Sequence, residues 1–134
     1  MHIEPYLFFP GSTKEAMEFY KSVFGGKLEI SLRSDMDPSA SEAEKSLVIN
    51  AQLASDQIMF RAADRDDTTL DPQTRIELTV NGSDEESLHK VFEELSADGT
   101  IEAPLEKQFW GDTWGKVTDK FGVTWQVNIE APKN

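Results

Sequence analysis

Arg75 and Glu77 are the charged pair with the clearest potential for chemistry in this chain. They stand two residues apart in a strand-like stretch, so both side chains would project from the same face of a strand. They can pair with each other, or they can bind the carboxylate and the amine of a ligand. If the two charges are buried, they need partners. The sequence leaves both alternatives open, and the two residues can also do both.

Trp110 and Trp114 lie four residues apart around Gly111 and Asp112. Indole rings can stack on an aromatic or a cationic ligand. The same two rings can instead be ordinary aromatic residues of a core or a dimer interface. Both interpretations stay open at this stage.

Residues 109–129 contain both tryptophans, and the strands expected there would position them. Residues 116–118 indicate a strand and 119–122 a turn, in which Gly122 can adopt positive φ without steric cost. Residues 123–129 then alternate strictly between apolar and polar side chains, which is typical of a half-buried strand. One face would pack on the core and the other would look into solvent or a cavity. The apolar set is Val123, Trp125, Val127 and Ile129, and the polar set is Thr124, Gln126 and Asn128.

Composition limits the classes of partner. A chain of 134 residues indicates one domain or two small halves that share a core. The net charge of −12 repels nucleic acid and anionic lipid. Acidity of this kind usually serves solubility, and it also suits a cationic ligand. We therefore expect no nucleic-acid or membrane partner.

The chain contains no cysteine, which excludes disulfides, thiol nucleophiles and cysteine-based metal sites. No apolar run approaches the roughly 20 residues that cross a bilayer. The first residues lack the basic region and cleavage site of a signal peptide. We expect a cytoplasmic protein.

The first half indicates a strand at 3–9, a helix that ends at Gly25-Gly26, and strands at 27–33, 47–53 and 57–62. Residues 12–15, with Ser12 and Glu15, fit a capping box at the start of the helix. Residues 34–45 are polar and acidic, and we expect a mobile loop there.

The second half repeats this order. A strand at 75–80 turns at Asn81-Gly82, a second capping box spans 83–86, a helix ends at Asp98-Gly99, and strands follow from 101. The two glycine–capping-box segments lie about 70 residues apart, half the chain, which indicates an internal duplication. The expected fold class is α+β, with two tandem βαβββ modules. We expect a single domain over 1–134, with modules at 1–63 and 74–134 and a charged linker at 64–73.

Several segments together carry a family resemblance: residues 5–9 (PYLFF), 16–26 (AMEFYKSVFGG), Trp110-Gly111, Gly115 and 119–125 (DKFGVTW). With them the chain resembles the vicinal oxygen chelate superfamily of glyoxalase I, bleomycin-resistance proteins and extradiol dioxygenases. It is most similar to the PhnB-like, demethylubiquinone methyltransferase-like branch. The resemblance implies a curled mixed-sheet cup with helices on the outside, and a homodimer. The modules can pair within one chain or swap between subunits.

This arrangement implies which side chains line the cup. On the first strand Pro5, Leu7 and Phe9 would face inward, whereas Ile76, Leu78 and Val80 would pack beneath a helix. The expected ligand pocket consists of Leu7, Phe9, Phe60, Arg75, Glu77, Trp110, Trp114 and Gln126.

Metal-dependent members of the superfamily hold a divalent ion with His or Glu on four strands. The corresponding positions fall here on Pro5, on Phe60 or Met59, on Arg75, and on Gln126. None of these is a good ligand, and an arginine repels a metal ion. We therefore predict no metal and no other cofactor. A metal enzyme would need displaced ligands such as Glu4, Glu77 or His2.

The sequence assigns no catalytic residue. Methyl transfer would need a glycine-rich nucleotide loop, and no G-x-G-x-x-G or G-x-S-x-G occurs. The favoured function is metal-free binding of a small molecule in the cup, for example bleomycin-resistance-like sequestering of a cationic compound. The alternatives are a metal-dependent lyase, isomerase or dioxygenase, and a structural dimer whose cup is filled by side chains.

Overall fold

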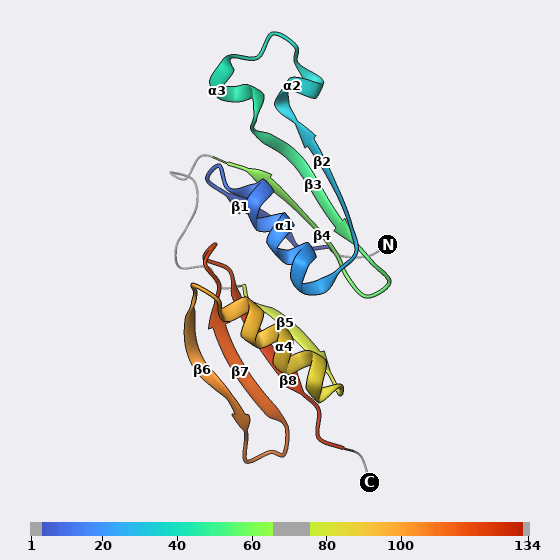
Figure 1. Cartoon of the computed structure of the whole chain (residues 1–134), viewed down its shortest axis with the longest axis vertical. Coiled ribbons are helices and arrows are strands. Elements are labelled where there is room, and N and C mark those ends of the chain that lie inside the picture. The colour runs from blue at the N-terminus through green and yellow to red at the C-terminus, as the bar shows by residue number, and fades with distance from the viewer. Residues whose placement is uncertain (1–3, 66–75, 133–134) are drawn as a thin grey trace. The chain divides into compact units, whose positions relative to one another are not determined.

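The computed structural model describes residues 4–65 and 76–132 of the chain. The chain divides into two compact units, Met1–Pro72 and Gln73–Asn134. Each unit has its own sheet and a long helix of its own, α1 in the first unit and α4 in the second (Figure 1). No helix among the described residues combines the length and hydropathy needed to span a membrane.

The first unit is a βαβββ module. Its elements are β1 (Tyr6–Phe9), α1 (Thr13–Phe24), β2 (Lys27–Leu32), α2 (Arg33–Met36), α3 (Glu42–Lys45), β3 (Val48–Ala54) and β4 (Met59–Asp64). The strand order in the sheet is β1-β4-β3-β2. β1 pairs with β4 in parallel, and the other neighbours are antiparallel.

The second unit repeats this plan. Its elements are β5 (Leu78–Gly82), α4 (Glu85–Ser96), β6 (Thr100–Lys107), β7 (Thr113–Thr118) and β8 (Thr124–Ile129). The strand order is β5-β8-β7-β6, again with a parallel first pair. Two mixed four-stranded sheets of equal topology confirm the duplication and the α+β fold class.

In each unit one helix covers one face of the sheet (Figure 1). α1 buries Ala16, Met17 and Tyr20, and α4 buries Leu88, Phe92 and Leu95. These residues recur at helical spacing, so each helix has one apolar stripe to place against the strands. We call the opposite face of each sheet its open face.

The start of α1 differs from the sequence prediction. Ser12 is the N-cap, but its side chain makes no capping hydrogen bond. Instead, the Asp64 carboxylate accepts from the amide of Thr13 at 3.0 Å and from the amide of Val48 at 2.8 Å. The parallel pairing of Phe9 with Asp64 brings this carboxylate to the helix N-terminus. In α4 the cap is Asp84, which accepts from Ser87 N at 3.3 Å.

Other segment boundaries also differ. Residues 34–45, expected as a mobile loop, contain most of α2 and all of α3, and Leu32 N donates to Asp35 at 2.8 Å beside α2. Asn81-Gly82, expected as a turn, forms the end of β5. Ile76, expected beneath the helix, is 75% exposed and precedes that strand. Asp64, expected in the linker, closes β4, and residues 66–73 lie outside the described part of the chain.

Candidate functional site

The open face of the second unit carries the polar side chains of β8. Trp125, Val127 and Ile129 are buried on the helix side, while Gln126 and its polar neighbours in the strand are partly exposed. This burial pattern confirms the predicted alternation of the strand. It follows that Gln126 lies on the open face.

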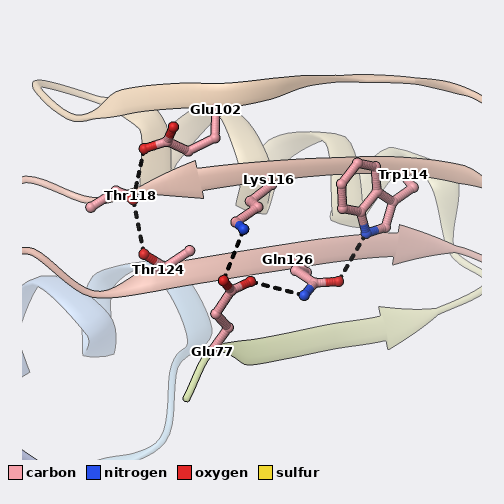
Figure 2. Close-up of polar contacts among 7 residues, drawn as sticks. All are labelled: Glu77, Glu102, Trp114, Lys116, Thr118, Thr124 and Gln126. Carbon is pink, nitrogen blue, oxygen red and sulfur yellow. Dashed lines mark hydrogen bonds and ion pairs between the residues drawn. The ribbon is translucent and has the colours of Figure 1, made fainter. Parts of the chain in front are cut away.

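A continuous row of contacts crosses this face, and we call it the polar ladder: Lys116, Glu77, Gln126 and Trp114 (Figure 2). Lys116 Nζ lies 2.8 Å from one carboxylate oxygen of Glu77. Gln126 Nε2 donates to the other oxygen at 2.9 Å, and Trp114 Nε1 donates to Gln126 Oε1 at 3.0 Å. The amide oxygen of Gln126 therefore has a donor, and its amide nitrogen has an acceptor.

Strand order explains why these four side chains meet. β8 lies between β5 and β7, and Gln126 is in register with Thr79 on one side and Lys116 on the other. Glu77 comes two residues before Thr79, and Trp114 two residues before Lys116, so each shares the face of its neighbour. The ladder is built from strand pairing and the residue that leads into β5.

Electrostatics keep the ladder in its charged form. The bond from Lys116 and then the bond from Gln126 hold the pKa of the Glu77 carboxyl below its ordinary value. The Glu77 and Lys116 side chains keep 29% and 31% of their surface exposed. An ionised carboxylate and an ammonium group are thus both within reach of a ligand at neutral pH.

The polar network continues on both sides of the ladder. Thr118 and Thr124 share a hydroxyl hydrogen bond of 2.9 Å, and Thr118 also contacts Glu102 at 3.2 Å (Figure 2). On the other side of the ladder, Asn128 of β8 donates to Asp112 at 3.1 Å, and Ala131 N donates to the same carboxylate at 2.8 Å. These two bonds hold the pKa of the Asp112 carboxyl below its ordinary value.

The structure separates the two tryptophans proposed as a pair. Trp114 belongs to the ladder, whereas Trp110 lies in the connection from β6 to β7 and is 51% exposed. The Trp110 ring makes an edge contact with Phe109, at 5.0 Å between centroids. Arg75 lies outside the described residues, and within them Glu77 pairs with Lys116.

The predicted pocket residues of the first unit lie on the opposite face from the one expected. Phe9 and Phe60 are almost fully buried and contact the ring of Tyr20 on α1, at 6.5 and 5.8 Å between centroids. Leu7 shares the face of Phe9 by strand alternation. These three side chains therefore belong to the face that α1 covers. The inward and outward positions expected for β1 and β4 were shifted by one residue, and a shift of one residue moves every side chain of a strand to the other face.

Glu4 and Arg61 occupy the open face of the first unit. Arg61 Nε donates to Glu4 at 2.9 Å, and Tyr6 is in register with Arg61. Glu4 precedes Tyr6 by two residues, just as Glu77 precedes Thr79, so the two carboxylates occupy equivalent positions in the duplicated modules. Because Pro5 and Leu7 were expected to face inward, strand alternation put Glu4 on the other face, and Arg61 was not predicted as a site residue. Aligning residues 60–62 with 125–127, both aromatic, polar, then aliphatic, would have found it.

These residues do not fit a divalent metal ion. Each open face offers one carboxylate at this position, and each carboxylate already pairs with a cation, Arg61 for Glu4 and Lys116 for Glu77. The fixed cation that already pairs with each of these two carboxylates opposes the binding of a second cation there. Among the described residues, no group of three or more His, Cys, Asp or Glu side chains is placed to hold a metal.

Known proteins resemble this chain along nearly its full length. A profile of the 3-demethylubiquinone-9 3-methyltransferase family matches residues 1–128. Protein YjdN from Escherichia coli K12 is 28% identical over 142 aligned residues, which cover 96% of this chain and 95% of YjdN. The structure of protein PA1353 from Pseudomonas aeruginosa has a TM-score of 0.85 at 28% identity, covering 98% of this chain and 99% of that one. The PhnB protein from Bacillus cereus has a TM-score of 0.77 at 29% identity, covering 97% and 100%.

A more distant structure shares the fold alone. A glyoxalase/bleomycin resistance/dioxygenase family enzyme from Burkholderia phytofirmans PsJN has a TM-score of 0.63 at 12% identity, covering 92% of this chain and 94% of that one. The near-complete family match, together with the duplicated βαβββ topology, identifies the chain. It belongs to the 3-demethylubiquinone-9 3-methyltransferase family, which its PhnB-like relative shares by name, and its fold is that of the glyoxalase/bleomycin resistance/dioxygenase proteins.

Proposed function

We propose that this chain binds a small organic molecule at the open face of its second unit, without a divalent metal. The observation that supports the proposal is the polar ladder from Lys116 to Trp114. Its donors and acceptors are fixed by strand pairing, and its charged groups remain partly exposed. Pre-oriented polar groups beside an aromatic surface are typical of small-molecule sites.

The ladder has unused capacity for a ligand. Lys116 uses one of its three N–H donors to bond Glu77, and each Glu77 oxygen can accept a further hydrogen bond. Trp114 adds an indole face on which an aromatic or cationic group can stack. The surplus of 25 acidic over 13 basic residues favours a cationic or neutral ligand. Sequestration of such a compound is the role we favour.

The family description suggests methyl transfer as a second candidate. Such a reaction needs a bound methyl donor, and the sequence has no glycine-rich nucleotide loop. Calorimetric titration with S-adenosylmethionine tests this candidate directly. We expect no heat of binding. A dissociation constant in the micromolar range would favour methyl transfer over sequestration.

A metal-dependent lyase, isomerase or dioxygenase of the same superfamily is the other alternative. It would require Glu4 or Glu77 to leave its cation and coordinate a metal instead. The cost of exchanging a formed ion pair for a ligand position argues against this route. We also propose a homodimer, as the resemblance to the superfamily implies; sedimentation analysis over a range of concentrations tests it.

Tryptophan fluorescence during a ligand screen tests the binding proposal. The three tryptophans have different environments: Trp114 is in the ladder, Trp110 is exposed on a turn, and Trp125 is buried. A ligand at the ladder should change the emission of wild-type protein and of Trp110→Phe, but not that of Trp114→Phe. Loss of the response in Trp110→Phe alone would place binding at the turn and refute the proposal.

A further inference from the structure

The open face of the first unit carries a row of planar groups, which we call the arginine–aromatic face and define as Tyr6, Phe8, Arg61 and Arg65. The rings of Tyr6 and Phe8 stack, with 4.8 Å between centroids and 14° between planes. The guanidinium carbon of Arg65 lies 3.6 Å from the centroid of the Phe8 ring. A guanidinium group and two rings therefore form one continuous stack along the edge strand β1.

Strand pairing fixes these side chains. The backbone amides of Arg61 and Arg65 donate to the carbonyls of Pro5 and Phe9 at 3.0 and 2.9 Å. Arg61 is in register with Tyr6, so the two side chains are direct neighbours across β1 and β4. The face is consequently pre-organised before any ligand arrives, which lowers the entropic cost of binding.

The charge of this face is unusual for an acidic chain. Among the described residues, the Arg61 side chain bonds only Glu4, through Nε, and it keeps 34% of its surface exposed, so its two terminal amino groups can still donate to a ligand. Within residues 4–65 and 76–132, the Arg65 guanidinium contacts a ring and pairs with no carboxylate. The face thus carries two guanidinium groups, of which Arg61 pairs with a carboxylate and Arg65 contacts a ring. An anion is the charge-complementary occupant.

We infer that the arginine–aromatic face binds a planar aromatic carboxylate. The carboxylate receives hydrogen bonds from the terminal amino groups of Arg61, and the aromatic ring stacks on Tyr6, which is 44% exposed. Arg65 holds the stack from its far end and adds positive potential. This surface uses only residues of the first unit, so the inference goes beyond the proposed function and does not depend on the polar ladder.

Titration of the full chain with benzoate tests the inference, read from the NMR signals of the Tyr6 ring. We expect saturable shifts with a dissociation constant of about 1 mM or tighter. Cyclohexanecarboxylate has the charge without the ring, and benzamide has the ring without the charge. Both should bind at least about threefold more weakly. Equal binding of all three compounds, or absence of any shift with benzoate, would overturn the inference.

The second unit suggests a fold-preserving variant. Arg61→Gln places at this site the residue that Gln126 provides in the second unit, where it bonds the equivalent carboxylate. The change should keep the bond to Glu4 and weaken benzoate binding about tenfold or more, because the guanidinium donors are lost. Lys21→Gln removes the same charge from an exposed position of α1 and serves as the control.

Two results would contradict the assignment. If Arg61→Gln and Lys21→Gln weaken benzoate binding equally, the effect is one of net charge and not of this face. If the Tyr6 shifts change on dilution in the absence of benzoate, a second copy of the chain covers the face instead. The benzoate titration is read from the Tyr6 ring of the first unit. If no ligand binds at the polar ladder of the second unit, this titration can therefore still succeed or fail on its own.

Discussion

Trp125 Nε1 donates to Asp119 Oδ2 at 2.8 Å inside the core of the second unit. The other oxygen of this carboxylate accepts from the amides of Phe121 and Val123, at 2.9 and 3.0 Å. A single buried side chain thus joins the β7–β8 turn to the core residue that follows it. Because β8 alternates with a period of two, anchoring Trp125 inward also fixes Gln126 on the open face.

Asp119→Asn should destabilise the second unit by about 1–3 kcal/mol. The amide nitrogen of asparagine would face either the two backbone donors or the indole donor, which leaves at least one of these donors without an acceptor. Urea denaturation followed by near-ultraviolet circular dichroism measures the loss. Asp56→Asn, at an exposed site in the β3–β4 turn, is the matched control and should change little. Equal midpoints for the two variants would contradict this role.

Glu77 makes the polar ladder sensitive to acid. Its pKa is lowered in the folded chain from an ordinary value of 4.5, so its ionisation stabilises the fold above pH 4.5. That contribution is lost as the pH falls through the lowered, folded-state pKa. A carbon-13 NMR titration of the Glu77 carboxyl should report a midpoint below 4.5.

Lys116→Met tests the cause of that shift. Lys116 makes the largest contribution to the lowering, so its removal should move the Glu77 pKa back towards 4.5. Gln126→Leu should have the same sign with a smaller effect. A Glu77 midpoint at or above 4.5 in the wild-type chain would show that the ladder does not form in solution.

Gly115 lies between Trp114 and Lys116 and sets how closely neighbouring groups approach β7. A Cβ at this position would lie 2.8 Å from Phe92 on α4 and 2.9 Å from the backbone of Leu105 on β6. Gly115→Ala should therefore cost about 1–3 kcal/mol of overpacking. Gly122→Ala is a useful comparison, because that site has open space and only a positive φ of 88° to oppose the substitution. A larger loss at Gly122 than at Gly115 would contradict the close packing of β7.

Asp64 replaces the capping box expected from the sequence. Asp64→Ala should lower the stability of the first unit by about 1–2 kcal/mol, because the amides of Thr13 and Val48 lose their acceptor. Ser12→Ala should cost little, since the Ser12 side chain makes no capping bond. The capping-box interpretation predicts the reverse order. Thermal unfolding of the two variants decides between them.

Local patterns in the sequence predicted the fold and one side of the candidate site. The phase of β8 was readable because Thr124, Gln126 and Asn128 alternate with large apolar residues. β1 gave no such signal: Tyr6, Leu7, Phe8 and Phe9 are all apolar or aromatic, so alternation could not tell one face from the other. The faces of β1 and β4 were therefore assigned from the family resemblance alone, and that assignment was wrong for Phe9 and Phe60.

Contacts between distant strands were harder to predict. Lys116 was not selected, because its partner Glu77 becomes a neighbour only when β5 pairs beside β8. The same holds for Glu4 and Arg61, which are 57 residues apart in the chain. Residue type and spacing predict which face a side chain takes, whereas strand order decides which side chains meet across the sheet.

Calorimetric titration of the strongest ligand from the fluorescence screen tests metal-free binding at the polar ladder most directly. The protein would be titrated before and after treatment with a chelator, with its metal content measured in the same samples. We expect one affinity for both samples and a loss of about tenfold or more in Gln126→Leu, which breaks the link between Trp114 and Glu77. Binding that disappears with the chelator and returns with one added metal ion per site would contradict the proposal.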